Sequence, residues 1–458
     1  MTNVGSDAAL VVIGGGAGGL SAARAAARRG AHVLLVQHGP LGGDCTFTGC
    51  VPSKALIEAA HRGVPFERAM AAARRAVEVI AATETDDVLH SEGVEVVQGW
   101  ATFRAPGVLD VDGRTFRAPR VIVATGASPA EPPIDGLADV DYLTSETIWD
   151  LETAPRSLAV LGGGAVGCEL AQALARLGSE VTVLEALDRI LAQEEPEASA
   201  TITAALGADR VEVRTGERVQ WVEALDRKGA VRLHLAHAST VEADRLLVAT
   251  GRRAALDGLG LDRAGVAVEG GFVRTDETLA TTAKGVWAVG DVTGRLPFTH
   301  VADEMGRVAA ANALGRLGRS RFRAGAIPWV TFTDPEVARV GVTEADAAEV
   351  GGRVAYLPMS DVDRAIAADE TIGFVKLLAG PRPLLRNTGG GRILGATIVA
   401  SRAGELVHEP ALAMRTGMFT GRLAQTVHAY PTWSVAIRQA AAQFFMETGG
   451  RTARAARR

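Results

Sequence analysis

Residues 8–20 read AALVVIGGGAGGL, a short apolar run followed at once by a glycine-rich turn. The run Ala8–Ile13 is typical of a buried β-strand, and we expect a helix at Leu20–Arg29 and a second strand at His32–Gln37. A glycine-rich turn between a strand and a helix is the pattern of a dinucleotide-binding unit. The sequence therefore predicts that a nucleotide-binding domain begins here.

Three glycines of this turn are expected to have separate roles. Gly14 permits the tight turn, Gly16 lets the backbone approach a pyrophosphate, and Gly19 lets the helix pack closely on the strand. The helix N-terminus then stabilises the phosphate charge. The residue that ends the second strand of such a unit usually binds a ribose. Here it is Gln37, whose amide can bond to a hydroxyl but lacks the charge assistance of a carboxylate.

The same pattern recurs in the middle of the chain, where residues 157–167 read SLAVLGGGAVG. We expect a strand at Ser157–Leu161, a helix at Cys168–Leu177 and a strand at Glu180–Glu185. One glycine fingerprint is weak evidence, but two that match in register, each between a strand and a helix, indicate two dinucleotide sites. The fingerprint glycines of the second copy are Gly162, Gly164 and Gly167.

The last residue of the second copy bears on which nucleotide it binds. Glu185 suits the free 2′-hydroxyl of NAD(H), because a 2′-phosphate would meet a like charge there. Arg189 is nearby, but no pair of arginines is placed for that phosphate. We therefore expect NAD(H) in preference to NADP(H).

Three further strands are expected to end at cofactors. The strands at 121–126 and 246–251 both end in Ala-Thr-Gly, and their candidate contact residues are Thr125, Gly126 and Gly251. Residues 284–294 read KGVWAVGDVTG and precede a helix expected at Ala302–Leu314. Asp291 in this stretch is either a helix N-cap or a ligand of a cofactor's polyol. The two dinucleotide sites upstream favour the second role.

Two of the three cysteines lie in residues 41–55, which read LGGDCTFTGCVPSKA. Residues five apart on a regular helix have Cα atoms roughly 8–9 Å apart, whereas a disulfide tolerates about 7 Å. If Cys45 and Cys50 form a disulfide, residues 46–49 must leave helix geometry, and Gly49 supplies the freedom. Cys50 would then begin a helix, where the dipole favours a thiolate. Two buried free cysteines remain the alternative.

Composition excludes several other classes. The 458 residues carry a net charge of −5 and only 5% aromatic residues, which does not favour nucleic acid as a partner. Three cysteines do not make a secreted disulfide framework. The N-terminal apolar run is too short for a signal peptide, and no apolar stretch is long enough to span a membrane. We expect a soluble cytoplasmic protein, and no residues suggest a resident metal ion.

The character of the chain changes at about Ile327. Antiparallel strands are expected at Trp329–Thr333, Val337–Val342, Gly373–Leu378 and Ile393–Val399, and helices at Ala403–Thr416 and Trp433–Phe445. This pattern indicates a separate α+β domain. Residues 449–458 contain four arginines, and we expect this basic tail to be disordered.

The chain contains two fingerprints, GGDCTFTGCVPSK, two Ala-Thr-Gly strands, Gly290-Asp291 and TFTDPEVARVG. Together these motifs resemble the class I pyridine nucleotide–disulfide oxidoreductases. That family includes dihydrolipoyl dehydrogenase, glutathione reductase and mercuric reductase. The resemblance implies an α/β fold with two Rossmann-like domains, for FAD and NAD(P)H, and a C-terminal α+β dimerisation domain. The implied boundaries are 1–150 and 276–326 for the FAD-binding and central domain, 151–275 for the NAD(P)H-binding domain, 327–446 for the dimerisation domain and 447–458 for the tail.

The resemblance also implies roles for individual residues. Cys50 would contact the flavin, Cys45 would face the substrate, and Lys54 and Glu169 would form an ion pair beside the flavin unless they make an ordinary helix salt bridge. The expected FAD site comprises Gly14, Gly16, Gly19, Gln37, Gly43, Lys54, Thr125, Gly126 and Asp291. The expected nicotinamide nucleotide site comprises Gly162, Gly164, Gly167, Glu185 and Gly251. The protein would be a homodimer in which each active site borrows residues from the partner.

One segment departs from the family pattern. Disulfide-reducing members carry His-Pro-Thr-x-x-Glu, in which the histidine is the acid/base and the glutamate orients it. Here Tyr430 replaces that histidine and Val435 replaces the glutamate. In an extended segment His428 would share a face with Tyr430 and could substitute, or it is a surface histidine. Tyrosine at this place resembles mercuric reductase, although no cysteine follows Cys168 to hand over a metal.

These features predict an FAD-dependent NAD(P)H oxidoreductase that passes electrons through a Cys45–Cys50 disulfide to a metal ion, quinone or disulfide acceptor. It would belong to a mercuric-reductase-like branch that lacks the extra metal-handling cysteines. A dihydrolipoyl dehydrogenase is the first alternative, favoured by Cys-Val-Pro-Ser-Lys at 50–54 and opposed by Tyr430. A non-catalytic redox-sensing flavoprotein is the second.

Overall fold

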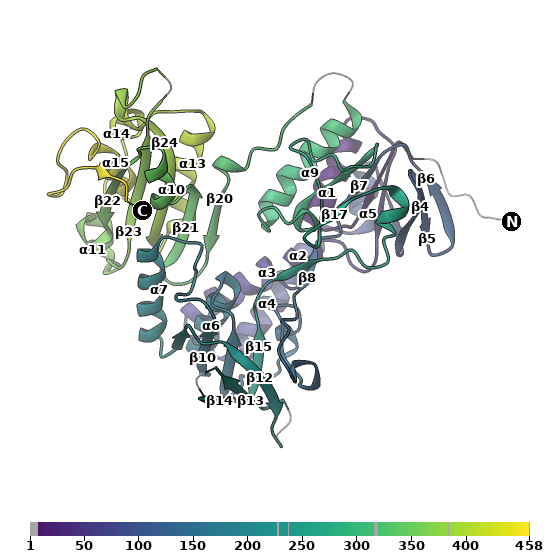
Figure 1. Ribbon diagram of the computed structural model, residues 1–458, viewed down its shortest axis with the longest axis horizontal. Coiled ribbons are helices and arrows are strands. Elements are labelled where there is room, and N and C mark those ends of the chain that lie inside the picture. The colour runs from purple at the N-terminus through teal and green to yellow at the C-terminus, as the bar shows by residue number, and fades with distance from the viewer. Residues whose placement is uncertain (1–7, 227–228, 237, 316–318, 383, 458) are drawn as a thin grey trace. The chain divides into compact units, whose positions relative to one another are not determined.

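The computed structural model describes residues 8–226, 229–236, 238–315, 319–382 and 384–457 (Figure 1). It divides into two compact units. The first comprises Met1–Pro132, Leu143–Thr153 and Thr250–Arg323. The second comprises Pro133–Tyr142, Ala154–Ala249 and Ala324–Arg458.

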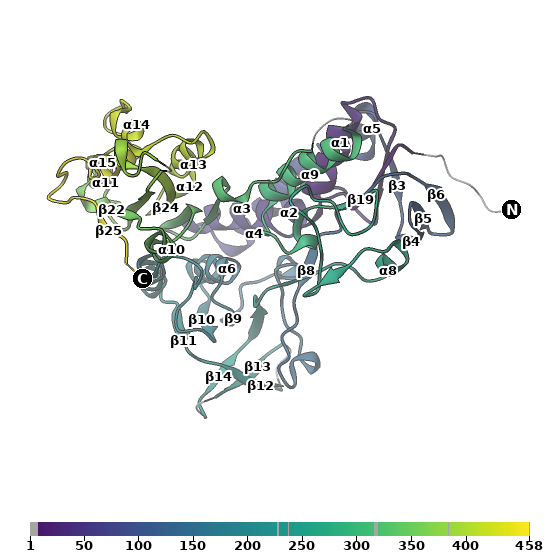
Figure 2. The same cartoon turned by 45° about the horizontal axis from the view of Figure 1, so that its top comes forward.

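The first unit is built on a parallel sheet with the strand order β19-β7-β1-β2-β3. The strands are β1 (Leu10–Ile13), β2 (Val33–Gln37), β3 (Val94–Gln98), β7 (Val121–Val123) and β19 (Val286–Ala288). Strands β1, β2 and β7 are buried along most of their length. On one face, Val11 and Leu34 share a hydrophobic core with Phe103, Leu109 and Phe116. Helices α1 (Ala17–Ala27) and α9 (Thr299–Leu314) lie side by side (Figures 1 and 2). Gly306 permits this approach, since a Cβ there would lie 2.4 Å from the carbonyl oxygen of Gly18.

Parallel strands bring three of the sequence motifs to one edge of this sheet. The first glycine turn, the Ala-Thr-Gly segment and Gly290-Asp291 follow the carboxyl ends of β1, β7 and β19. Asp291 lies in a 3-10 turn at Gly290–Thr293, and α9 begins at Thr299, three residues before the helix start expected from the sequence. Asp291 is therefore not the N-cap of that helix.

The other elements of the first unit are shorter. An antiparallel sheet contains β4 (Ala101–Ala105), β5 (Val108–Val111) and β6 (Arg114–Arg117). Two-stranded pairs join β8 (Ala127–Pro129) to β16 (Arg252–Ala254) and β17 (Val268–Glu269) to β18 (Phe272–Val273). The remaining α-helices are α2 (Gly43–Phe47), α3 (Cys50–His61), α4 (Phe66–Ala81), α5 (Asp86–Ser91) and α8 (Leu261–Ala264).

The second unit opens with a smaller parallel sheet in the order β11-β10-β9-β15. Its strands are β9 (Ser157–Leu161), β10 (Glu180–Glu185), β11 (Glu212–Thr215) and β15 (Arg245–Val248), and its helices are α6 (Ala165–Arg176) and α7 (Pro196–Ala208). The bounds of β9 and β10 are those expected from the sequence. An antiparallel sheet of β12 (Val219–Ala224), β13 (Val231–Leu235) and β14 (Thr240–Ala243) accompanies it.

An antiparallel sheet in the order β20-β21-β24-β23-β22-β25 forms the C-terminal part of the second unit (Figure 1). Its strands are β20 (Pro328–Thr331), β21 (Glu336–Gly341), β22 (Arg353–Pro358), β23 (Phe374–Gly380), β24 (Arg392–Ala400) and β25 (Arg454–Ala455). Its helices are α10 (Glu344–Glu349), α11 (Asp363–Ala368), α12 (Ala403–Leu406), α13 (His408–Arg415), α14 (Thr420–Gln425) and α15 (Val435–Ala442). The expected α/β fold with an antiparallel α+β C-terminal part is thus confirmed. None of the helices among the described residues combines the length and the apolar character needed to cross a lipid bilayer.

The prediction of a disordered tail is wrong for the part of it that the structure describes. Arg454 and Ala455 form β25, an edge strand that pairs with β22. The arginines that suggested a solvated tail are instead held by carboxylates: Arg454 bonds to Glu344 and Arg451 bonds to Asp361. Arg458 lies outside the described residues.

Candidate active site

The first and third glycines of each fingerprint are required by the chain itself. Gly14 and Gly162 have φ values of +104° and +110°, which side chains rarely adopt. A Cβ on Gly19 would lie 1.8 Å from the carbonyl oxygen of Gly14, and a Cβ on Gly167 would lie 2.0 Å from that of Gly162. These contacts fix the close packing of α1 and α6 on the strands that precede them.

The second glycine of each fingerprint has no such neighbour. A Cβ on Gly164 would meet nothing within 4 Å, and one on Gly16 would meet only the Cα of Gly43, at 3.9 Å. The described residues therefore leave open space at these two positions, at the N-termini of α6 and α1. Open space beside helix N-terminal amides fits a pyrophosphate at both turns. Gly42 also donates to the carbonyl oxygen of Gly15 at 2.9 Å, so the cysteine-bearing loop lies against the first turn.

A cavity of about 320 Å³ opens at the carboxyl ends of β1 and β2 in the first unit. Gly14, Gln37 and Thr125, all expected to contact a cofactor, line it. The hydroxyl of Thr125 is buried and has no hydrogen-bond partner among the described residues. An unsatisfied buried hydroxyl in a cavity is a ready partner for a ligand, so this end of the unit fits the adenosine part of FAD. The polar and aromatic lining residues that sequence reasoning missed are His38, Trp100, Ser128, Arg253 and Asp257.

Gln37 and Glu185, the two residues expected to bind riboses, each accept a hydrogen bond from the glycine turn of their own dinucleotide-binding unit. Oε1 of Gln37 accepts from the Gly15 amide at 2.6 Å, and Oε2 of Glu185 accepts from the Gly163 amide at 2.7 Å. Oε1 of Glu185 also accepts from the Leu187 amide at 2.8 Å. The repeat seen in the sequence therefore extends to a matching hydrogen bond. Ribose contacts remain a prediction for both side chains.

The two cysteines are brought together by a break between two helices. Cys45 lies in α2, and α3 begins at Cys50, as expected. The chain leaves helix geometry at residues 48–49, later than the predicted 46–49, because Phe47 is still helical. Gly49 donates to the carbonyl oxygen of Asp44 at 2.5 Å, and a Cβ on Gly49 would lie 2.9 Å from that oxygen. Only glycine fits this tight loop.

Cys45 and Cys50 are present as thiols in the structure, and their side chains hydrogen-bond to each other. Cys45 is half-buried and Cys50 is exposed. The hydrogen bond with Cys50 raises the pKa of the Cys45 thiol above its usual range, and burial raises it further. A hydrogen bond from Thr299 acts in the opposite direction. These neighbours therefore favour the neutral thiol form of Cys45.

Cys50 also contacts Thr299, with 3.3 Å between Sγ and Oγ1. Thr299 begins α9, the helix that follows the turn containing Asp291. Cys50 thus points toward the side of the first unit where the flavin's polyol is expected. Cys50 is more exposed than Cys45, whereas a cysteine that faces the flavin would be expected to be the less exposed of the two. The roles of the two cysteines remain predictions.

A charged cluster that sequence reasoning missed adjoins this pair. The guanidinium of Arg252 bonds to Asp44 and to the carbonyl oxygen of Ala127, and its Nε lies 3.6 Å from Oδ2 of Asp291. Burial raises the pKa of Asp291, and the charge of Arg252 opposes that shift. The available signals were an acid directly before Cys45 and an arginine directly after the second Ala-Thr-Gly.

Lys54 and Glu169 lie in different units, and their ion pair remains a prediction. Lys54 is on α3, where its Nζ donates to Oγ of Ser53 at 3.3 Å. Glu169 is on α6 with 5% of its surface exposed, and its Oε1 accepts from the Phe332 amide at 2.8 Å. Burying a carboxylate to this degree costs free energy unless hydrogen bonds or a cation compensate it, and the Phe332 amide supplies one such hydrogen bond.

His428 and Tyr430 do not present a common face. The His428 side chain is 6% exposed, with Nε2 3.0 Å from Oε1 of Glu409 and Nδ1 3.0 Å from the carbonyl oxygen of Thr426. The reading of His428 as a surface histidine is therefore wrong. Tyr430 is 72% exposed, and its hydroxyl donates to Asp363 at 2.7 Å, which raises its pKa above the usual range. Val435 is buried at the start of α15.

Comparison with known proteins agrees with this geometry. Residues 8–306 match the family model of pyridine nucleotide-disulphide oxidoreductases, and residues 327–441 match the dimerisation domain of that family. The chain is 38% identical to a mercuric reductase of Streptomyces lividans, over 95% of this chain and 96% of that protein. It is 35% identical to a dihydrolipoyl dehydrogenase of Thermus scotoductus, over 94% and 96% of the two chains.

Solved structures show the same relationship. The Cu(II) complex of the HOCl-induced flavoprotein disulfide reductase RclA from Escherichia coli superposes with a TM-score of 0.88 and 28% identity, covering 96% of this chain and 99% of that one. With these matches, the chain belongs to the pyridine nucleotide-disulphide oxidoreductases, enzymes that use FAD and a pyridine nucleotide, and Cys45 and Cys50 are its redox pair.

Proposed function

We propose that this enzyme passes electrons from NADH, through FAD and the Cys45–Cys50 pair, to a thiophilic metal ion such as Hg(II) or Cu(II). The observation that carries the proposal is the environment of Tyr430. Its hydroxyl already donates to Asp363, and the neighbouring place of the family's orienting carboxylate is the buried Val435. The histidine and glutamate that form the acid/base pair of disulfide-reducing relatives are thus replaced by Tyr430 and Val435, which cannot form such a pair.

The two kinds of acceptor need different chemistry. Reduction of a disulfide releases a thiolate that must be protonated, which a positioned acid assists by about 10²–10⁴ in rate. Tyr430 suits that task poorly, because its pKa is raised from an already high value. A metal ion needs soft ligands instead, and thiolates provide them. With Hg(II), the Cys45–Cys50 dithiol becomes a disulfide, two electrons reduce the ion to Hg(0), and two protons are released.

The residues around the pair supply the remaining functions. When bound, FAD converts the hydride chemistry of the nicotinamide into the dithiol chemistry of the cysteines. Thr125, Gln37 and Asp291 would hold it. Glu185 would accept the 2′-hydroxyl of NADH and repel the 2′-phosphate of NADPH. We further propose a cytoplasmic homodimer that forms through the dimerisation domain at 327–441.

The names of similar proteins support a metal acceptor. The relative from Streptomyces lividans is named a mercuric reductase, and the Escherichia coli reductase was solved as a Cu(II) complex. A second function, dihydrolipoyl dehydrogenase, is favoured by one observation: His428 and Glu409 form a histidine–carboxylate pair. Because both ring nitrogens are engaged and the side chain is 6% exposed, that pair is poorly available to a substrate.

An anaerobic acceptor panel tests the proposal. Purified enzyme is given NADH and, in turn, Hg(II), Cu(II), a quinone, glutathione disulfide or lipoamide. We expect turnover with a metal ion that the Cys45→Ser and Cys50→Ser variants lose, whereas the matched Cys168→Ser variant keeps it. Lipoamide turnover is expected to be lower by about 10²–10⁴ than the rate of flavin reduction by NADH. Fast lipoamide turnover, or metal reduction by Cys45→Ser, contradicts the proposal.

A further inference from the structure

The loop at 186–195 joins β10 to α7 and lies against the second glycine turn. It begins directly after Glu185. The Leu191 amide donates to the carbonyl oxygen of Gly163 at 2.8 Å, and Ile190 is fully buried. A Cβ on Gly163 would lie 2.6 Å from Cγ2 of Ile190. The loop therefore forms one wall of the turn to which we assign the pyridine nucleotide.

The far end of this loop is held by the antiparallel sheet. Glu194 is 7% exposed, and its two oxygens accept from Nε1 of Trp329 and from Nε of Arg339, both at 2.8 Å. Arg339 also donates through Nη2 to the carbonyl oxygen of Gln193 at 2.9 Å. Its guanidinium stacks over the Trp329 ring, 4.3 Å from the centroid. Strands β20 and β21 thus hold two consecutive loop residues.

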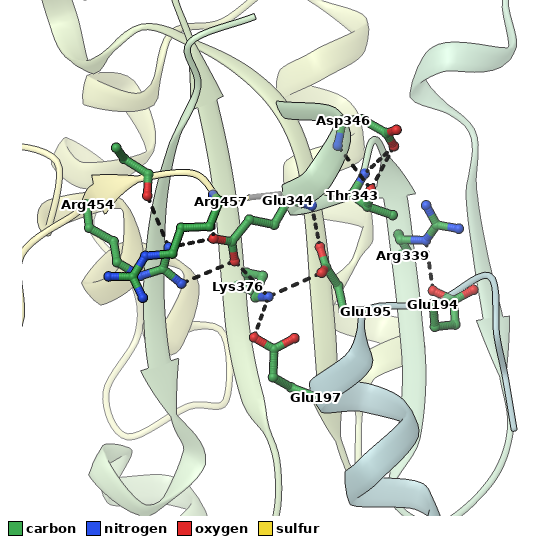
Figure 3. A network of polar contacts seen from close by, with 11 residues as sticks. Glu194, Glu195, Glu197, Arg339, Thr343, Glu344, Asp346, Lys376, Arg454 and Arg457 are labelled. Atoms are coloured by element: carbon green, nitrogen blue, oxygen red, sulfur yellow. Dashed lines mark hydrogen bonds and ion pairs between the residues drawn. The ribbon is translucent and has the colours of Figure 1, made fainter. Parts of the chain in front are cut away.

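Lys376 on β23 makes a second attachment (Figure 3). It is 1% exposed, and its Nζ lies 3.2 Å from Glu195, 2.7 Å from Glu197 and 3.0 Å from Glu344. The Glu344 amide donates to the other oxygen of Glu195 at 2.7 Å. Burial lowers the pKa of Lys376, but the three carboxylates outweigh burial and raise it. The lysine is therefore a fixed positive charge at the end of the loop.

Buried charges of this kind are strongly interdependent. Removing one partner of a buried ion pair is far more disruptive than removing an exposed one, because the remaining charge has no solvent to replace the lost contact. Without Lys376, Glu195 would lose its only cation among the contacts described here while remaining 2% exposed. The adjacent loop would be expected to shift toward solvent. A loop that must become ordered when the ligand binds lowers the affinity for that ligand.

We infer that Lys376 and Arg339, on the dimerisation domain, are positioning residues for the pyridine nucleotide. They hold the 186–195 loop, and through Ile190 and Leu191 the loop keeps the second glycine turn in its binding shape. The inference rests on the proposed assignment of NADH to that turn. It makes the affinity for NADH depend on side chains of a different domain from the one that contacts the nucleotide.

The test separates NADH affinity from flavin chemistry. The holoenzyme variants Lys376→Met and Arg339→Gln are mixed with NADH in a stopped-flow instrument, and the rate of flavin bleaching is followed against NADH concentration. We expect the dissociation constant for NADH to rise about tenfold, while the limiting rate and the FAD content per subunit stay within about twofold. Arg339→Gln serves if Lys376→Met does not fold. Lys376→Arg, which keeps the charge, is expected to regain part of the affinity.

The matched control is Thr397→Val, opposite Lys376 on β24 and fully buried, which removes no charge. It is expected to bind NADH as the wild type does. If Lys376→Met and Arg339→Gln both melt at a lower temperature but keep the wild-type dissociation constant for NADH, the inference is overturned. Equal losses of FAD and NADH overturn it as well.

One further variant distinguishes an error in the proposed nucleotide site from an error in the positioning role of Lys376 and Arg339. Gly164→Val fills the open space of the second turn and is expected to abolish NADH binding. If Gly164→Val binds NADH normally, the proposed nucleotide site is wrong, and the inference that rests on it is wrong too. If Gly164→Val loses NADH but Lys376→Met and Arg339→Gln bind it normally, only the positioning role is wrong.

Discussion

The sulfur of Cys50 lies 3.3 Å from the hydroxyl oxygen of Thr299, the first residue of α9. This contact links the redox loop to the helix that follows the turn containing Asp291. The same hydroxyl lowers the pKa of Cys45, opposing the hydrogen bond with Cys50 and the burial that raise it. Thr299 is therefore the one neighbour in this group that favours the thiolate form.

Replacing Thr299 with valine is expected to slow thiolate chemistry. The hydroxyl lowers the pKa of Cys45, so its removal raises that pKa further, and the reactive thiolate forms only at higher pH. A neutral hydrogen bond of about 0.5–1.5 kcal/mol corresponds to roughly a two- to tenfold lower rate at pH 7.5. Alkylation of the reduced enzyme by iodoacetamide across pH measures this. Thr299→Ser should restore the wild-type profile, and an unshifted Thr299→Val profile contradicts the role.

Glu185→Gln is expected to shift the coenzyme preference toward NADPH. The carboxylate ties its turn through the Gly163 amide at 2.7 Å, and Gln37 makes the equivalent bond in the first unit, so glutamine fits this geometry. Loss of the negative charge removes repulsion of a 2′-phosphate and should lower the NADH-to-NADPH ratio of kcat/KM by about tenfold. The matched variant Gln37→Glu should leave this ratio unchanged. An unaltered ratio in Glu185→Gln would mean that another residue sets the preference.

Tyr430→Phe is expected to leave metal reduction within about threefold of wild type, because the hydroxyl is engaged by Asp363 and is a poor acid or base. The pKa of Tyr430 is raised above its ordinary value, so this side chain stays neutral throughout pH 6–9 and adds no step to the pH profile in that range. Steady-state rates across this range, with Hg(II) as acceptor, provide the measurement. A profile that loses an ionisation step in Tyr430→Phe would assign the tyrosine a proton-transfer role.

The nucleotide-binding elements could be predicted because their signal is local. In β9 and β10, the apolar period and the adjacent glycines specify strand, turn and helix within thirty residues. The break between Cys45 and Cys50 followed from disulfide reach and helix geometry alone. Both kinds of inference use neighbours in sequence, and neither needs the rest of the chain.

Long-range charge pairing could not be predicted in the same way. Lys376 lies in an apolar strand and meets carboxylates about 180 and 30 residues distant in sequence. The cavity residue Trp100 follows β3, which is far from Gln37 in sequence but pairs with β2 in the sheet. The four arginines of the tail suggested solvation because composition does not reveal that Glu344 and Asp361 are there to bind two of them.

Arg454→Gln is expected to destabilise the enzyme in a pH-dependent way. Burial raises the pKa of Glu344, but Arg454 and Lys376 outweigh it and leave the pKa below the ordinary value. A carboxyl group with a depressed pKa stabilises the fold above its unfolded pKa of about 4.3, and that contribution is lost as pH falls through the folded value. The variant should therefore melt about 1–3 °C below wild type at pH 7, with a smaller difference near pH 4. Arg457→Gln is the matched control, because Arg457 contacts Glu344 through its backbone amide. Differential scanning calorimetry measures both, and a difference that is constant across pH would assign the effect to the lost edge strand and not to the ion pair.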